Sequence, residues 1–296
     1  MKSGTVRLRR GFAIRRRTMV LAAALSLGIA LILIVPDRPA PEAWLRSNSG
    51  GAAVSILSFN AFEGGRPGVD ALNTIDAAAP DIVCLQEMTP ELEAAFVRRF
   101  GGRYPHRYFR PGQMTQGVGI ASRYPLADGR VLTLGLTYLP AVSATVRMES
   151  GVVRVACVHL MPPFARFKKR VNVWKRYFRN RTIRIGQAAE LLKHLDSLDM
   201  PAIIMGDMNE WRGQAALALL RDAGFDDSCG GTASRCGPTW PGPVLPLPAL
   251  FRIDHIFGRE VRFTDSAVLE AGGSDHYPVA ARMFLESREL AAGSAR

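Results

Sequence analysis

The sequence has few cysteines, no internal repeat and no sustained heptad, and these absences narrow the class of protein. Without a repeat or a heptad, a solenoid and a long coiled coil are excluded. The four cysteines form no CxxC motif with partner histidines, so a zinc site of that kind is not supported. With 296 residues, of which 48% are apolar, the chain can bury one large domain or two small ones.

The excess of positive charge is confined to two blocks of the chain. Residues 1–17 carry seven Lys or Arg and residues 166–184 carry nine, and neither block contains an acid. Because the whole chain has a formal net charge of +12, the remainder carries about −4. A uniformly basic surface that wraps nucleic acid therefore describes this chain poorly.

One long uncharged run, residues 18–35, follows the first basic block. As a helix it would span about 27 Å, close to the thickness of a bilayer core. The arginines before it predict a cytoplasmic segment at residues 1–17 and an exported remainder, periplasmic or extracellular. A cleaved signal peptide shares this order, but the long run and the weak cleavage pattern after it favour an uncleaved, single-pass anchor. Residues 36–53, which contain three prolines and the stretch SNSGG, predict a linker.

The cysteines fit an exported protein. Cys229 and Cys236 flank the short polar stretch GGTASR, a spacing that favours a loop-closing disulfide outside the cytoplasm. Cys84 and Cys157 each lie in an apolar, strand-like run, and we expect both to be buried free thiols.

After the linker, short apolar runs alternate with stretches of helical spacing, at residues 69–79, 91–100 and 182–198. Helices are few between the later strands. The pattern therefore favours an α/β (α+β) fold with two mixed, largely antiparallel sheets and helices outside, rather than a simple parallel sheet. Residues 229–250, rich in Gly and Pro, predict a long loop. The predicted strands are VSILSF, DIVCLQ, GVGIAS, SATVRM, VVRVACVHL, AIIMGD, RIDHIF and HYPVAARMF.

Six of the strand-like segments finish in an acid, an amide or a histidine. Each such residue alone has an ordinary explanation as a cap or a core residue, but the recurrence at one kind of position indicates a shared cleft. Carboxylates and amide oxygens without thiolates suit Mg²⁺ or Mn²⁺, and two histidines beside them can stabilise or protonate phosphate oxygens. These parts suit phosphoester hydrolysis. The residues are Asn60, Glu87, His159, Asp207 with Asn209, Asp254, and Asp275 with His276.

The ordered motifs SFNAFEG, IVCLQEM, GVGIASRYPL, VACVHL, IIMGDMNE, RIDHIF and GSDHYPV resemble those of the endonuclease/exonuclease/phosphatase superfamily, which has the DNase I-like fold. The resemblance runs from about Val54 to Met283. It implies a four-layer sandwich over residues 54–285, followed by a tail at 286–296. It also implies a divalent-metal-dependent hydrolase of phosphodiesters or phosphomonoesters.

The resemblance also implies roles on the metal side of the site. Glu87 resembles the principal metal-binding glutamate, with Asn60 and Asp275 helping around the cation. Asp207 and Asn209 resemble the pair that orients the attacking water and the phosphate.

On the phosphate side, His276 with Asp254 resembles the family's His and Asp pair, and His159 resembles the second histidine. Whether Asp207 or His276 takes the proton stays open. His255 has no role by motif, and strand alternation directs it toward core packing.

A basic and aromatic stretch, residues 164–184, follows His159. Its apolar residues recur at steps of three and four, as on one face of a helix, which is typical of an interfacial membrane helix. Two other interpretations stay open: the apolar stripe packs on its own domain, or the stretch is a track for single-stranded nucleic acid. The stripe consists of Phe164, Phe167, Val171, Trp174 and Phe178.

Four hypotheses follow for the whole chain. The first is a membrane-anchored phosphoesterase that acts outside the cytoplasm on lipid or other small phosphoesters, and the second is an anchored DNA or RNA nuclease. The third is a catalytically idle binding module. Every expected catalytic position keeps a reactive side chain, which argues against this hypothesis. The fourth, a structural membrane protein, does not explain six polar strand ends. No protein partner is predicted.

Overall fold

The computed structural model describes residues 38–46, 53–61, 69–135, 138–165, 172–231 and 234–285. The predicted segments 1–17, 18–35 and 286–296 lie outside these residues. None of the described helices is both long and apolar enough to cross a membrane.

Two 6-stranded sheets form the centre of the domain. Their orders are β11-β12-β1-β2-β4-β3 and β5-β6-β7-β8-β10-β9. The pairs β1–β2 and β7–β8 are parallel, and the other described pairs are antiparallel. The first sheet contains β1 (Val54–Asn60), β2 (Ile82–Gln86), β3 (His106–Arg110), β4 (Val118–Ser122), β11 (Val261–Val268) and β12 (Val279–Leu285). The second contains β5 (Leu126–Thr133), β6 (Pro140–Met148), β7 (Gly151–His159), β8 (Ala202–Asp207), β9 (Asp226–Asp227) and β10 (Asp254–Arg259).

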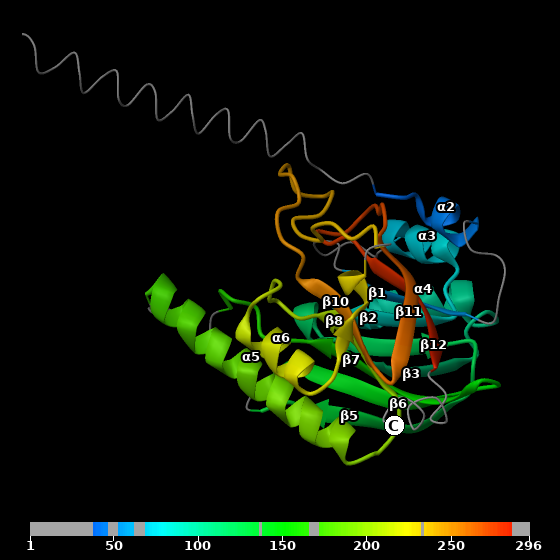
Figure 1. Ribbon diagram of the computed structural model, residues 1–296. Helices are drawn as coiled ribbons and strands as arrows, with labels where there is room; N and C mark the ends of the chain where they lie inside the picture. Colours follow the sequence, from blue (N-terminus) through cyan, green and yellow to red (C-terminus); the bar gives the residue numbers. More distant parts are fainter. Residues whose placement is uncertain are drawn as a thin grey trace, which may run out of the picture. The chain divides into compact units, whose positions relative to one another are not determined.

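Helices cover the outer faces of both sheets (Figure 1). The first sheet is covered by α3 (Val69–Ala78) and α4 (Pro90–Phe100), with α2 (Pro41–Arg46) beside α3. The second is covered by α5 (Val173–Asp196) and α6 (Ala215–Asp222). Short 3₁₀ turns occur at η1 (Met114–Gln116) and η2 (Ser228–Gly230). The expected two mixed sheets flanked by helices are confirmed.

Each layer follows from local sequence. In α4, Thr89 accepts a hydrogen bond from the Leu92 amide at 3.2 Å and caps the helix, and Pro90 occupies its first turn. Leu92, Phe96 and Phe100 then form the buried face of this helix. The same spacing rule places apolar residues of α3, of α6 and of the second half of α5 against their sheets.

The segment predicted as a linker, residues 36–53, contributes to the domain. Its helix α2 carries Trp44, which is fully buried against the first sheet's outer core. Arg38, just before α2, donates a hydrogen bond to the Pro238 carbonyl at 2.8 Å and stacks over the ring of Tyr277 at 3.9 Å. The packed domain therefore extends back to residue 38.

The expectation of free thiols at Cys84 and Cys157 is wrong. The two cysteines form a disulfide across the core between the sheets, from β2 to β7. Alternation on each strand points both side chains inward, so the face-to-face packing brings their Cα atoms to 5.5 Å. The predicted bond between Cys229 and Cys236 is confirmed.

The predicted apolar stripe does not form one helical face. Phe164 lies in a turn before α5, while Phe167 and Val171 lie outside the described residues. Trp174 and Phe178 are on α5 but are 65% and 60% exposed. The buried face of this half of α5 is polar, because its residues hold the segment that follows β7; these residues are Arg176, Asn180, Arg184 and Gln187.

Candidate active site

Three of the predicted residues lie side by side at one edge of the second sheet. Asp207, the last residue of β8, is in register with His159 on the parallel strand β7 and with Asp254 on the antiparallel strand β10. Asp254 therefore begins its strand rather than ending it, and antiparallel pairing still brings it to the same edge. Asp275 and His276 likewise precede their strand, β12.

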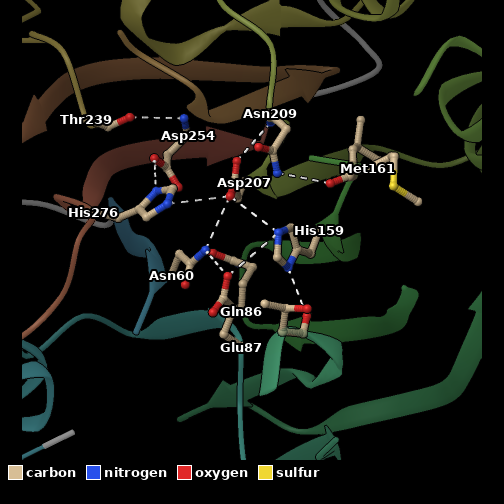
Figure 2. Close-up of polar contacts among 12 residues, drawn as sticks. Asn60, Gln86, Glu87, His159, Met161, Asp207, Asn209, Thr239, Asp254 and His276 are labelled. Carbon is tan, nitrogen blue, oxygen red and sulfur yellow. Dashed lines mark hydrogen bonds and ion pairs between the residues drawn. The ribbon is translucent and has the colours of Figure 1, made fainter. Parts of the chain in front are cut away.

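The first sheet supplies the residues opposite. Asn60 ends β1 in register with Gln86 of the parallel strand β2, and Glu87 follows directly. The amide nitrogen of Asn60 donates to Glu87 Oε1 at 3.1 Å and to Asp207 Oδ2 at 3.2 Å. One side chain thus joins the edges of the two sheets (Figure 2).

One oxygen, Asp207 Oδ2, is the point on which these side chains converge. Besides the Asn60 amide, His159 Nε2 lies 3.4 Å from it and His276 Nε2 lies 3.7 Å from it (Figure 2). Its partner Oδ1 accepts the backbone amide of Asn209 at 2.8 Å, and the Asn209 side chain donates to the Leu160 carbonyl. The carboxylate is held from several sides and is 2% exposed.

In both histidines, the nitrogen that faces away from the cleft, Nδ1, has a polar partner of its own. His276 Nδ1 lies 2.8 Å from Asp254 Oδ2, and His159 Nδ1 lies 3.1 Å from the Thr115 carbonyl. A carbonyl or carboxylate at Nδ1 selects the tautomer with the proton on Nδ1 and leaves Nε2 facing the cleft.

The surrounding backbone holds the His276 and Asp254 pair in place. Ser274 donates to the Asn60 carbonyl at 2.7 Å and accepts the His276 amide at 3.0 Å. The hydroxyl of Thr239 accepts the Asp254 amide at 3.2 Å. Neither Ser274 nor Thr239 has a position in the strand pattern, so no pattern in the sequence indicated their role.

Two site residues adopt left-handed backbone conformations. Glu87 has φ 58° and Asn209 has φ 51°, and neither is glycine. Such conformations cost about 1 kcal/mol or more and persist only where the surroundings hold them. At Gly206, in the strand that carries Asp207, a Cβ atom would lie 1.9 Å from the Val158 carbonyl oxygen. Only glycine lets β7 and β8 approach this closely beside the site.

Burial and mutual charge shift the ionisation of all four central groups. Burial raises the pKa of Glu87, and it raises the pKa of Asp207 to about 7 against the opposing charge of His276. Burial lowers the pKa of His159. Burial alone would also lower the pKa of His276, but the Asp254 and Asp207 carboxylates outweigh it and raise this pKa to about 10. The site thus favours a charged imidazole beside shared carboxylates.

The donors fit a hard divalent cation. Glu87 Oε2 is buried and has no hydrogen-bond partner among the described residues, which is costly for a carboxylate oxygen unless a cation binds it. Neighbouring oxygens rather than thiolates suit Mg²⁺ or Mn²⁺. A second group, Asp207, Asp254 and His276, offers ligand atoms within 4.8 Å of one another, but there Asp254 and His276 already bond each other. Glu87 is therefore a candidate cation ligand whose free oxygen is not explained by another contact among the described residues.

Asp275 and His255 lie to the sides of this centre. Asp275 is half-buried and acts on His276 through its charge, and the described contacts include no hydrogen bond from it to Glu87 or Asn60. His255 points away as predicted: it is fully buried, with Nε2 2.9 Å from the Glu210 carbonyl and Nδ1 3.7 Å from Asp227.

A cavity of about 430 Å³ opens above the catalytic groups. Its floor includes Glu87, His159, Asp207 and His276. Its walls are apolar and aromatic, a feature that the strand pattern did not predict because most wall residues come from irregular segments. The wall residues are Pro162, Pro163, Phe164, Ala165, Tyr177, Trp211, Trp240, Phe251 and Ile253, with Asn209 near the floor.

A buried ion pair, also absent from the sequence-based prediction, supports one wall. Arg184 Nε donates to Glu210 Oε1 at 2.9 Å, and its Nη1 donates to the Met161 carbonyl at 2.9 Å. Asn180 donates to the Pro162 carbonyl at 2.8 Å. The polar face of α5 thus fastens the segment after His159 to the segment after Asp207.

Comparison with known proteins identifies the family of the chain. A model of the Endonuclease/Exonuclease/phosphatase family matches residues 57–276. No curated protein sequence matches the chain. An endonuclease/exonuclease/phosphatase from Beutenbergia cavernae is 19% identical, with a TM-score of 0.60 over 79% of this chain and 72% of that one. A humanized D. rerio TDP2 is 19% identical, with a TM-score of 0.62 over 79% and 99%. D. rerio TDP2 complexed with single strand DNA product is 19% identical, with a TM-score of 0.59 over 79% of this chain and 99% of that one. At this identity the structural likeness shows the fold.

Proposed function

The chain belongs to the endonuclease/exonuclease/phosphatase family and is a metal-dependent phosphoesterase, and from this premise we propose that it hydrolyses phosphoesters outside the cytoplasm at a membrane surface. One observation carries the proposal. Side chains from the edges of two sheets converge on Asp207 Oδ2 at the floor of a cavity, beside a buried Glu87 oxygen that has no partner among the described residues.

Glu87, with Asn60 beside it, would hold Mg²⁺ or Mn²⁺. When bound, the cation supplies charge neutralisation at the phosphoryl oxygens. Asp207 and Asn209 orient the attacking water and the phosphate, because both project from the end of β8 toward the cavity. His159 places its ring beside the phosphate, with Nδ1 held by the Thr115 carbonyl and Nε2 facing the cleft.

The proton transfers use Asp207 Oδ2 and His276 Nε2, two atoms of residues that line the cavity. The oxygen of water bonds to phosphorus, and one of its protons passes to Asp207 Oδ2. The bond between phosphorus and the ester oxygen breaks, and its electron pair leaves with that oxygen. His276 Nε2 protonates the leaving oxygen, and Asp254 stabilises the ring through Nδ1. Transfer of the proton from Asp207 to solvent, and uptake of one by His276, restore the starting state.

Two features support the location. The uncharged run at residues 18–35 follows a basic segment, the order of a single-pass anchor with its N-terminus in the cytoplasm. All four cysteines of the chain are paired in disulfides, which persist in oxidising compartments. A phosphatase reporter fused at the C-terminus should be active only outside the cytoplasm. A reporter active only inside would overturn the location and leave the chemistry standing.

A second candidate function is that of an anchored nuclease. The observation in its favour is the row of rings at Trp211, Phe251 and Trp240, since aromatic side chains can stack nucleobases. D. rerio TDP2, which is similar in structure, forms a complex with single strand DNA product.

The deciding experiment is a substrate panel with the purified full chain. We expect hydrolysis of bis-p-nitrophenyl phosphate that requires Mg²⁺ or Mn²⁺ and stops in EDTA. The same panel includes plasmid DNA, RNA, phospholipid vesicles and inositol phosphates, with His276→Ala as the inactive control. If none of these substrates is hydrolysed in a metal-dependent way, the proposal is refuted.

A further inference from the structure

The cleft separates charge from apolar surface. Four ionisable groups lie at the floor, those of Glu87, His159, Asp207 and His276. The walls present the rings of Phe164, Tyr177, Trp211, Trp240 and Phe251. No Lys or Arg is among the described residues that line the cavity. A ligand that fills it therefore meets one polar end and an apolar body of about 430 Å³.

This arrangement is poorly matched to a polyanion. Proteins that bind nucleic acid gain most of their affinity from Lys and Arg placed against successive phosphates. The described walls offer apolar contact instead, which stabilises a ligand in proportion to the apolar area that it buries. The ligand that suits both parts carries a single phosphoester at one end and an apolar chain at the other.

Further exposed apolar side chains lie in the two groups of segments that carry the cavity walls, residues 164–178 and residues 211–251. The rings of Phe164, Tyr177 and Phe178 follow one another at centroid distances of 5.9 Å and 5.5 Å. In the second group, the rings of Trp211 and Phe251 are 5.4 Å apart. We call the exposed apolar residues of these two segments the rim; they are Phe164, Val173, Trp174, Phe178, Trp211, Val244, Leu247, Leu250 and Phe251.

The chain length before the domain indicates what covers the rim. In the proposed function the membrane span ends at Val35, and the packed domain begins at Arg38. Three residues reach at most about 11 Å, so the tether keeps the start of the domain beside the bilayer. Arg38 bonds the carbonyl of Pro238, two residues before Trp240 of the cleft wall. The tethered end of the domain is thus attached to the loop that carries one side of the rim.

The chemistry of the rim suits a lipid surface. Trp174 is 65% exposed and Leu247 is 61% exposed, and side chains of this kind insert between lipid headgroups. Lys175 is exposed between Trp174 and Phe178, where its ammonium group can meet lipid phosphates while its stem lies along apolar surface.

Building on the proposed function, we infer that the substrate is a phospholipid: the rim rests on the bilayer, the lipid's phosphoester reaches the catalytic floor, and its apolar part contacts the aromatic walls. The bond that is hydrolysed is the phosphoester already described, so the step needs water and no other reactant.

The walls are tested without a bilayer, using the full chain and a matched pair of soluble phosphodiesters. Dihexanoyl phosphatidylcholine below its micelle concentration carries short acyl chains, and glycerophosphocholine is the same diester without them. We expect kcat/KM to be at least about tenfold higher for the acylated member. In EDTA, tryptophan fluorescence should respond to the acylated member only. Equal kcat/KM for the pair, or a higher value for a single-stranded DNA oligonucleotide, would overturn the inference.

The rim is tested with the full chain reconstituted into vesicles of phosphatidylcholine and phosphatidylglycerol. The double variant Trp174→Ser with Leu247→Ser should lower the ratio of lipid hydrolysis to bis-p-nitrophenyl phosphate hydrolysis at least about tenfold. The control, Val131→Ser with Val152→Ser, removes exposed valines that do not line the cleft, and should keep the ratio within about twofold. Equal ratios in the two double variants would overturn docking by the rim.

A further measurement does not depend on turnover. Brominated phospholipids quench the fluorescence of indole rings that lie in the bilayer. The difference in emission between the wild-type protein and Trp174→Phe gives the fluorescence of Trp174, and we expect brominated lipid to quench it. Absence of that quenching would also overturn the inference. If no substrate of the panel is hydrolysed with either metal, the proposed function fails as well. Hydrolysis of this ester without lipid preference leaves the proposed function standing and refutes only the phospholipid.

Discussion

Asp254 Oδ2 accepts a hydrogen bond from His276 Nδ1 at 2.8 Å, and both side chains are buried. The bond determines which nitrogen faces the cleft, where His276 Nε2 lies 3.7 Å from Asp207. His159 reaches the same carboxylate but is oriented by a backbone carbonyl. The two histidines therefore differ in what their loss would disturb.

His276→Ala should lower turnover on the order of 10³-fold, because it removes a positioned proton donor at the leaving oxygen. Asp254→Asn should cost somewhat less and add little in the double variant, since paired groups act as one unit. Loss of His159 should combine nearly additively with loss of Asp254. A double-mutant cycle on one phosphodiester measures this. Additive losses for Asp254 and His276, with coupling between Asp254 and His159, would show that the pairing is wrong.

Glu87→Gln should raise the Mg²⁺ or Mn²⁺ concentration needed for half-maximal activity by at least about tenfold, because the variant keeps the shape but loses the charge of the cation's main ligand. Calorimetric titration of Mn²⁺ gives the same comparison without turnover. The matched control is Glu91→Gln, an exposed carboxylate on α4. Unchanged metal affinity and activity in Glu87→Gln would contradict the assignment.

The two disulfides should differ in how much they stabilise the fold. The bond between Cys84 and Cys157 closes a separation of 73 residues, and that between Cys229 and Cys236 closes 7. Loop-closure entropy then predicts a loss of about 4 kcal/mol when the first pair is changed to alanine and about 2 kcal/mol for the second. Urea unfolding of the two double variants measures both. A larger loss for the short loop would contradict this account.

Asp227 should make the fold sensitive to acid. Burial alone raises the pKa of Asp227, but the nearby ring of His255 and the hydrogen bonds from Arg252 outweigh burial and hold this pKa well below its usual range. A depressed carboxyl pKa contributes stability that is present above the unfolded pKa and is lost as pH falls toward the folded value. Asp227→Asn should therefore cost about 1–3 kcal/mol at neutral pH and less as pH falls below about 4.

The measurement for Asp227 is the unfolding free energy of variant and wild type across this pH range. Asp226→Asn, at the exposed neighbouring residue, is the control and should stay within about 0.5 kcal/mol of wild type at every pH. A difference between Asp227→Asn and wild type that grows on acidification would reverse the expected sign.

The sequence predicted the buried strands and missed the irregular ones. VSILSF and AIIMGD are almost wholly buried, so their apolar residues mark them. The strand β3 is half-buried throughout its first four residues, β5 is largely exposed, and β11 has an irregular register between Phe263 and Asp265. In such strands the apolar and polar residues do not alternate cleanly, and no pattern reports them.

The polar residues of the site were predictable because strand pairing alone gathers them, as at His159, Asp207 and Asp254. The aromatic walls were not, because Trp211, Trp240 and Phe251 come from segments without periodicity. The link between Cys84 and Cys157 depends on the distance between sheets, which strand-by-strand reasoning does not contain.

Because the site is divided between two sheets, we expect its rate of turnover to depend on the distance between the sheets. Asn60 and Glu87 follow the first sheet, while His159 and Asp207 follow the second, so the distances among them depend on the side chains packed between the layers. Ile56, Val155 and Met205 belong to that layer and do not line the cavity. We expect a methyl group added or removed there to alter the separation of the reacting atoms, so that turnover depends on the hydrophobic interior as well as on the catalytic residues.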